Sequence, residues 1–482
     1  MYKKQHVFLI VLSFIFFIAA ADAQIRLPKI IGDNMVLQRN QPVPVWGWTK
    51  PGHAVKINFA GQVKTTVADT TGYWKVSLNP MPANNKGQQM NIVCDTSNIT
   101  LKNILIGEVW FCSGQSNMEY SMKLMKGYIK PFKGVDSAEL ELSAVNPNIR
   151  LFKVEKVYSL PDVTTRGWNE SAGSSLEAFS AVGYYFAKNV YSKLHIPIGM
   201  IEASWGGSRI EPWTPPYGYA ALPAFKAEST TEPMMVDSAA VGKMYKSMVY
   251  PIAPYALHGF LWYQGESNCM INEKENRYVH KMQALIDSWR KDFDAPKASF
   301  YSVLIAPYYY TKRKDHVPHT TETLPEFWEQ QVNSTKIPNT DIISVTDLVD
   351  DFKNIHPSYK WEVGRRMALV ALAKDYGFKN TVYSGPRYQK VEIKDGKAIL
   401  YFNHAQGLKS SDGQPLNFFT IAGTDGNFMN ADAEIVGNTV IVSSLLVPKP
   451  KTVRFAWTET ANPNLVNAAG LPAFPFRTDG KK

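Results

Sequence analysis

The chain has 482 residues, which is too long for a single hydrophobic core, so we expect two or three domains. Its 45% apolar and 20% charged residues are usual for a soluble globular protein, and the net charge of +10 is spread along the chain without a basic run that would indicate a nucleic-acid partner. Three cysteines are too few for a disulfide scaffold and lack the spacing of a zinc site.

Residues 1–23 predict a secretory signal. Lys3 and Lys4 form the charged start, and residues 7–18 are an apolar stretch too short for a comfortable membrane span. Ala21-Asp22-Ala23 fits the small-x-small cleavage pattern. No later segment reaches about 18 uninterrupted apolar residues, so we expect a periplasmic or secreted protein without a membrane span in the mature chain.

Residues 24–105 predict an N-terminal β-sandwich-like domain. Short runs of β-branched and aromatic residues alternate there with turn signals such as Lys50-Pro51-Gly52. The expected strands are residues 43–48, 54–59, 63–68, 74–78 and 90–94.

Residues 106–378 predict an α/β catalytic domain with a parallel sheet covered by helices on both faces, giving three layers. The expected strands are residues 104–112, 198–204, 259–263, 299–305 and 341–345. The expected helices are residues 177–194, 276–293, 326–336 and 358–376. Residues 119–175 and 211–245 lack a clear period and predict long functional loops or an insertion.

Residues 379–482 predict a second, C-terminal β-domain, because short strands and turns such as Lys394-Asp395-Gly396 return. The expected strands are residues 390–393, 398–402, 418–422, 439–443 and 452–457.

The most informative motif is the pentapeptide Gly114-Gln115-Ser116-Asn117-Met118. An apolar run leads into it and an expected helix starts near Asn117, so Ser116 lies where open α/β sheets place their chemistry. A helix start offers free N–H groups and partial positive charge, which suit an anionic intermediate. The competing interpretation is an ordinary serine N-cap.

Two further polar segments also follow predicted strands and should converge on Ser116. Adjacent Gly206 and Gly207 let the backbone approach a ligand and offer an N–H to an oxyanion, or simply form a tight turn. The amides of Gln264 and Asn268 are further oxyanion donors, or members of a structural hydrogen-bond network.

His356 supplies a candidate general base. It lies on the loop after the last predicted strand of the α/β region, where an imidazole can take the Ser116 proton and return it to a leaving alcohol.

Three motifs, in this order, carry a resemblance to a known family: Gly-Gln-Ser-Asn-Met, Trp-Tyr-Gln-Gly-Glu-Ser-Asn and Ile-His-Pro. The chain resembles the sialate O-acetylesterase family of SGNH-type (GDSL-like) hydrolases over nearly its whole mature length, including residues 34–38 and 470–477. The resemblance implies a carbohydrate esterase that removes O-acetyl groups without a metal or other cofactor. It implies Ser116 as nucleophile, His356 as base, and an oxyanion hole of the Ser116 N–H, a glycine at 206 or 207 and an amide from residues 264–268.

The chain departs from the family pattern before the histidine. An aspartate usually stands two or three residues upstream, where this chain has Asn354 and Lys353. The nearest acids are Asp351, Asp350 and Asp347, and we expect the orienting carboxylate among them in that order of preference.

Several alternatives stay open at this point. The expected partner is an O-acetylated sugar or glycan, either a sialic acid or acetylated xylan or another polysaccharide, and a non-catalytic glycan-binding protein is the alternative of another class. A general α/β-hydrolase is disfavoured because Met118 replaces the last glycine of G-x-S-x-G. A disulfide between Cys112 and Cys269 is also open. The candidates for contact with the substrate are Trp205, Arg209, Trp262 and Glu266.

Overall fold

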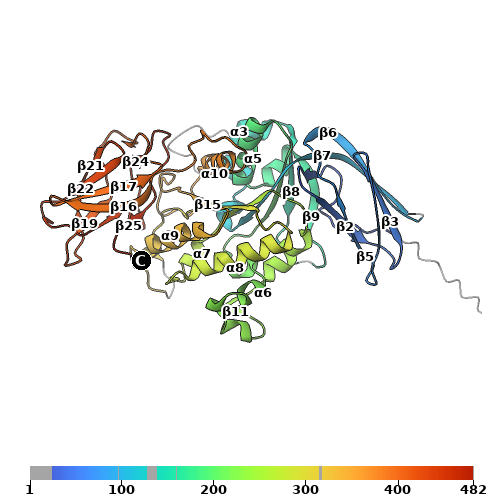
Figure 1. Cartoon of the computed structure of the whole chain (residues 1–482), viewed down its shortest axis with the longest axis horizontal. Coiled ribbons are helices and arrows are strands. Elements are labelled where there is room, and N and C mark those ends of the chain that lie inside the picture. The colour runs from blue at the N-terminus through green and yellow to red at the C-terminus, as the bar shows by residue number, and fades with distance from the viewer. Residues whose placement is uncertain (1–23, 96, 128–137, 159, 314–316, 481–482) are drawn as a thin grey trace, which may run out of the picture.

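The computed structural model describes residues 24–95, 97–127, 138–158, 160–313 and 317–480. A central α/β region lies between a β region formed by the N-terminal part of the chain and another formed by its C-terminal part (Figure 1). The predicted signal over residues 1–23 lies outside the described residues. Within the described residues, no helix is long and apolar enough to cross a membrane.

The central sheet has the strand order β15-β14-β13-β7-β10-β8-β9. All neighbours from β15 to β8 pair in parallel, and β9 closes one edge antiparallel to β8. The bounds are β7 Ser97–Gly114, β8 Asn146–Val154, β9 Thr165–Ser171, β10 Ile198–Ser204, β13 Gly259–Tyr263, β14 Ser299–Val303 and β15 Thr340–Ile343.

Helices cover both faces of this sheet, as the strand–helix alternation predicts. Side chains of α5 and α10 share one core with Trp110 and Cys112 of β7, whereas side chains of α8 and α9 share another with Phe111, whose side chain points to the opposite face. The bounds are α5 Ala181–Leu194, α8 Arg277–Asp292, α9 Thr323–Asn333 and α10 Lys360–Lys374.

The N-terminal β region is joined to the central sheet by one continuous strand. Strand β7 pairs with β1 and β6 in its first part and with β10 and β13 in its second, so the predicted boundary at residues 105/106 falls inside a strand. The three-domain division therefore stays a prediction. The bounds are β1 Val36–Gln38, β2 Val43–Trp48, β3 Ala54–Phe59, β4 Gln62–Val67, β5 Tyr73–Leu78 and β6 Asn84–Cys94.

The C-terminal β region contains two four-stranded antiparallel sheets, β16-β17-β22-β21 and β20-β19-β23-β25, and a short pair, β18-β24. The bounds are β16 Arg387–Lys394, β17 Lys397–Asn403, β18 Lys409–Ser410, β19 Phe419–Ala422, β20 Met429–Asn430, β21 Asp432–Val436, β22 Thr439–Ser443, β23 Thr452–Phe455, β24 Leu465–Val466 and β25 Phe476–Arg477.

The aperiodic segment 119–175 differs from the expectation of loops, because it supplies β8 and β9 of the main sheet. Register shifts interrupt their pairing, and β9 is an edge strand rich in polar residues, so neither strand shows clean alternation in sequence. All three cysteines are buried and free, so no disulfide joins Cys112 to Cys269.

Candidate active site

The register of three parallel strands brings three of the predicted segments to one edge of the sheet. Gly114, the last residue of β7, pairs with Ser204 at the end of β10 and with Tyr263 at the end of β13. A Cβ at Gly114 would lie 2.2 Å from the Tyr263 carbonyl oxygen, and its φ of +141° is one that other residues rarely adopt. A glycine is therefore required for the chain to leave the sheet here and begin the turn that carries Ser116.

Ser116 and His356 meet at this edge although 240 residues separate them. The His356 Nε2 atom lies 2.8 Å from the Ser116 Oγ atom, within hydrogen-bond distance. Ser116 begins α1 (Ser116–Glu119), a single helical turn close to the expected helix start near Asn117, and His356 lies in the segment between β15 and α10. Both side chains line a pocket of about 190 Å³ whose other walls are Glu119, Tyr120 and Leu124.

The surroundings of His356 favour a neutral imidazole. Burial lowers its pKa below the ordinary 6.5, and the nearby Lys360 ammonium lowers it further, while Glu119 acts in the opposite direction. A neutral imidazole accepts a proton at Nε2, so the pair can act as hydroxyl nucleophile and general base.

None of the three carboxylates expected to orient His356 hydrogen-bonds to it among the described residues. Asp347 makes two 2.7 Å bonds with the Arg366 guanidinium, and Asp350 accepts from the Tyr359 hydroxyl. Asp351, the preferred candidate, accepts from the Lys353 backbone N–H at 2.8 Å. Each of the three therefore has another structural partner, and the expected contact is not formed.

Asn117 instead links the serine turn to the histidine loop. Its Nδ2 donates to the Ile355 carbonyl oxygen at 3.1 Å, immediately before His356, and also to Glu266 Oε1. Lys360 Nζ donates to Asn117 Oδ1. A second local bond, from the His356 N–H to Asn354 Oδ1 at 2.9 Å, fixes the same stretch of backbone.

The Lys360 and Glu266 side chains that hold Asn117 are both fully buried. Burial lowers the pKa of Lys360 to about 7 and raises that of Glu266, because a charged group loses its hydration there.

Gly206 lies against Ser116, and its N–H donates to a carboxylate. A Cβ at Gly206 would lie 3.4 Å from the Ser116 Cβ, and the Gly206 N–H donates to Glu119 Oε2 at 2.6 Å. Glu119 also pairs with Lys156 at 2.5 Å. The Ser116 N–H has no hydrogen-bond acceptor within the described part of the chain. Gly207, with a φ of +73°, is exposed beside this position.

Gln264 and Asn268 do not reach the pocket. Both are fully buried, and Gln264 Nε2 donates to Gln115 Oε1, to the Ser208 carbonyl and to Asn268 Oδ1. Asn268 Nδ2 donates to Glu211 and Glu273. These amides therefore form the structural network that was the competing interpretation.

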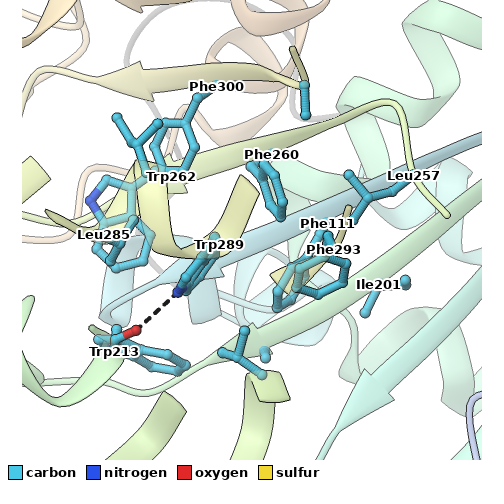
Figure 2. Close-up of a cluster of buried hydrophobic side chains, with 14 of the residues drawn as sticks. Phe111, Ile201, Trp213, Leu257, Phe260, Trp262, Leu285, Trp289, Phe293 and Phe300 are labelled. Atoms are coloured by element: carbon cyan, nitrogen blue, oxygen red, sulfur yellow. Dashed lines mark hydrogen bonds between the residues drawn. The ribbon is translucent and has the colours of Figure 1, made fainter. Parts of the chain in front are cut away.

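Trp262 and Glu266, two of the four candidates for sugar contact, are also sealed inside the protein. Trp262 is 1% exposed and packs against Trp213 and Trp289, in the aromatic cluster of Figure 2. Glu266 is 0% exposed and accepts from Asn117, so it supports the turn that carries Ser116.

Arg209 and Trp205, the other two candidates, lie nearer the surface. The Arg209 guanidinium is paired internally with Glu211 and donates to the Asp237 carbonyl, as an internal salt bridge would. Trp205 is half-buried and stacks on the exposed Tyr158, with ring centroids 4.8 Å apart. Lys243 Nζ lies 3.9 Å from the centre of the Tyr158 ring.

Two groups of side chains with metal-ligating atoms occur among the described residues, and neither includes Ser116 or His356. One is His53, Cys94 and Asp95, in which the imidazole pairs with the carboxylate. The other is Glu211, Asp237 and Glu273, and the Lys281 ammonium occupies its centre, 2.7 Å from Glu211 and 2.6 Å from Asp237.

Sequence reasoning missed Asn117, Glu119 and Lys360. Asn117 follows Ser116 within the motif and Glu119 stands just after it, so their position was a signal, but an asparagine and a glutamate in a helical turn are usually ordinary polar residues. Lys360 gave no signal, because a lysine at a helix start is almost always solvated.

Comparisons with known proteins show the family of the chain. Residues 106–373 match the family model of carbohydrate esterases described as sialic acid-specific acetylesterase. The sialate O-acetylesterase of Homo sapiens is 27% identical over 504 residues, covering 95% of this chain and 93% of that protein. That of Mus musculus is 28% identical and covers 81% of each chain. The crystal structure of a carbohydrate acetylesterase from Xanthomonas citri is 31% identical, with a TM-score of 0.83 over 94% of this chain and 99% of that one.

Proposed function

Because the chain belongs to the sialic acid-specific acetylesterase family of carbohydrate esterases and hydrolyses O-acetyl esters on carbohydrates, we propose that it does so as an SGNH-type serine hydrolase. The observation that carries the proposal is the 2.8 Å contact between Ser116 Oγ and His356 Nε2 in an open pocket. A nucleophile and base within hydrogen-bond reach are the minimum for acyl transfer through a covalent intermediate.

The reaction follows from the two side chains. His356 Nε2 takes the proton of Ser116 as Oγ bonds to the acetyl carbonyl carbon, and the carbonyl oxygen becomes an oxyanion. When the carbonyl re-forms, the ester C–O bond breaks and the imidazolium gives its proton to the departing sugar oxygen. Water then attacks the acetyl-Ser116 with His356 again as base, which releases acetate and restores the free serine.

The N–H groups of Ser116 and Gly206 are the proposed oxyanion donors, because they border the nucleophile on adjacent strand ends. The Glu119 carboxylate now accepts from Gly206, so it must withdraw before an oxyanion forms there. Lys156, already paired with Glu119, is the partner that would hold it aside.

Asn117 is the proposed substitute for the missing orienting acid. It fixes the peptide that precedes His356, and its own amide is held at both ends by Lys360 and Glu266. The imidazole is then positioned through the backbone instead of through a carboxylate on Nδ1. This role makes Asn117 a positioning residue, since it touches neither the acetyl group nor the reacting oxygen.

An O-acetylated sialic acid is the proposed substrate. The family description and the mammalian relatives support it, and the Trp205–Tyr158 stack with Lys156 and Lys243 offers aromatic surface and positive charge for an acidic sugar. Export through the N-terminal signal, to a periplasmic or extracellular place of action, belongs to the same proposal. So does the division into an α/β catalytic domain and two flanking β-domains.

Acetate release from a panel of O-acetylated sugars tests the proposal. We expect 9-O-acetylated sialic acid to be cleaved faster than acetylated xylan, and Ser116→Ala to abolish release from both. Faster cleavage of xylan would overturn the substrate. Retained turnover in Ser116→Ala would overturn the nucleophile, and binding without release by the unaltered protein would show a glycan-binding protein instead.

A further inference from the structure

A second cavity, separate from the Ser116 pocket, lies between the start of α10 and the C-terminal β region. Its volume is about 430 Å³, within the range of small-molecule sites. Trp361, Glu362 and Arg366 of α10 form one wall. Asp412, Asn462 and Asn464 of the C-terminal β region form the other. The two sites adjoin along the chain, because Lys360 supports the catalytic turn and the next residue, Trp361, lines the cavity.

The lining combines an aromatic side chain with hydrogen-bonding groups, as saccharide sites do. Trp361 is half-buried and packs against Tyr359 with ring centroids 5.3 Å apart, so its indole is supported from one side. The Asn462 amide makes no hydrogen bond within the described residues and is half-exposed at the cavity. An aromatic face packs against the C–H face of a sugar ring, while an amide exchanges hydrogen bonds with its hydroxyls.

The charges of the lining select against an anionic sugar. Asp347, Glu362 and Asp412 contribute three carboxylates; Asp347 pairs with Arg366 and Glu362 pairs with Arg365, so among the described residues Asp412 carries the unbalanced negative charge. The Arg366 guanidinium is already bound to Asp347, to Glu362 and to the Ser344 carbonyl, so it has little capacity left for a ligand.

Asp412 stays ionised across the physiological range. Hydrogen bonds from Ser410, Asn464 and the Gln414 N–H lower its pKa to about 2. Carboxylates accept hydrogen bonds from sugar hydroxyls but repel a sugar carboxylate.

We propose that this cavity binds an uncharged, hydroxyl-rich saccharide unit, outside the pocket that hydrolyses the ester. Such a unit would be a neutral neighbour of the acetylated sugar in a larger glycan. Its position beside an acetylated sugar rests on the proposed function, whereas its binding in the cavity does not. Trp361 packs against the sugar ring, Asp412 accepts hydrogen bonds from its hydroxyls, and Asn462 exchanges hydrogen bonds with them. The cavity then contributes to the choice of glycan through a sugar that is not itself deacetylated.

Calorimetric titration of the full chain carrying Ser116→Ala tests the site without turnover. The probes are xylohexaose, which is neutral, and N-acetylneuraminic acid, which is anionic. We expect xylohexaose to bind through the cavity, and adding Trp361→Ala to weaken it at least tenfold. Trp361→Phe, which keeps an aromatic face, should restore most of the affinity. Tyr250→Ala, at an exposed tyrosine outside the cavity, is the matched control and should leave binding unchanged.

Three results would overturn the inference. The first is that xylohexaose does not bind, and the second is that it binds equally well with and without Trp361. The third is that N-acetylneuraminic acid binds more tightly and depends on Trp361. If Trp361→Ala does not fold, Asn462→Ala gives the same comparison at a half-exposed position. Failure of the serine assignment would appear only in acetate release, so the two proposals fail in different measurements.

Discussion

The loops that follow β7 and β13 start side by side, since Gly114 and Tyr263 pair at the edge of the sheet, yet their polar residues reach opposite environments. Ser116 opens into a pocket beside His356, whereas Gln264 and Asn268 are fully buried in a hydrogen-bond network. In the sequence, both segments carry polar side chains that could take part in catalysis. The difference teaches that a polar motif at a strand end contains reacting groups and the scaffold that supports them, and that burial separates the two.

Replacing the proposed nucleophile, Ser116, should have the largest effect. Ser116→Ala removes the attacking oxygen while the half-buried site tolerates a smaller side chain, so we expect hydrolysis of an aryl acetate to fall by about five orders of magnitude. The thermal unfolding midpoint should change little. Steady-state rates and a melting curve check the two expectations, and a loss of less than about tenfold would mean that another group attacks the ester.

Removing the link between the two loops should have the next largest effect. Asn117→Ala removes the hydrogen bond to the Ile355 carbonyl, so the His356 imidazole is no longer held at its position beside Ser116. A misplacement of about 1 Å can lower the rate about 100-fold. We expect kcat to fall about 10- to 100-fold with little change in KM.

The control for this prediction is Asn189→Ala, which also removes a bond from an asparagine side chain to a backbone carbonyl but lies on α5; Asn189 is half-buried, whereas Asn117 is fully buried. It should leave kcat unaltered. Equal kcat in Asn117→Ala and the control would show that another element positions the imidazole.

Asn268 tests the buried hydrogen-bond network that follows β13. Asn268→Ala removes one donor from the buried carboxylates of Glu211 and Glu273, which both keep Lys281, and it takes away the acceptor of the buried Ile210 N–H. The free energy of unfolding should therefore fall by about 1–3 kcal/mol. The folded fraction should keep most of its kcat, because this amide does not face the pocket. Urea unfolding combined with active-site titration measures both quantities. A 100-fold loss of kcat at unchanged stability would instead make Asn268 an oxyanion donor.

Strands β7, β10, β13, β14 and β15 of the central sheet were predictable because apolar runs of five to nine residues reveal buried parallel strands, whereas β8 and β9 were not, because their pairing is irregular and β9 is a polar edge strand. Ser116 and His356 were predictable as a pair, since the carboxyl ends of parallel strands share one edge. The buried state of Gln264, Trp262 and Glu266 was not, because an isolated sequence does not show which side of a loop faces solvent. The missing acid illustrates the same limit. The sequence shows that no aspartate precedes His356 at the usual spacing, but only the fold brings Asn117 to Ile355.

The pH dependence of the reaction should reflect the environment of His356. The imidazole must be neutral to accept the serine proton, so kcat/KM rises as pH increases through its pKa in the free enzyme. Burial and Lys360 lower that pKa, and the acid limb should therefore have its midpoint below pH 6.5. Lys360→Met removes the repelling charge and should move the midpoint upward. A midpoint above 6.5 in the unaltered protein, or a downward movement in the variant, would contradict this assignment.

The smallest effect is expected at Glu119, whose carboxylate accepts from the Gly206 N–H that is proposed to bind the oxyanion. This carboxylate also pairs with Lys156, so displacing it breaks the bond from Gly206 while the partly exposed ion pair with Lys156 remains. Glu119→Gln lowers the negative charge beside the forming oxyanion, and we expect kcat/KM on an uncharged aryl acetate to rise about two- to fivefold. Lys156→Met should do the reverse, because the carboxylate then has no alternative to Gly206. Opposite changes in the two variants, measured at one pH, would identify Glu119 as a gate over the oxyanion position. A loss of activity in both would mean that the glutamate supports the Gly206 turn instead.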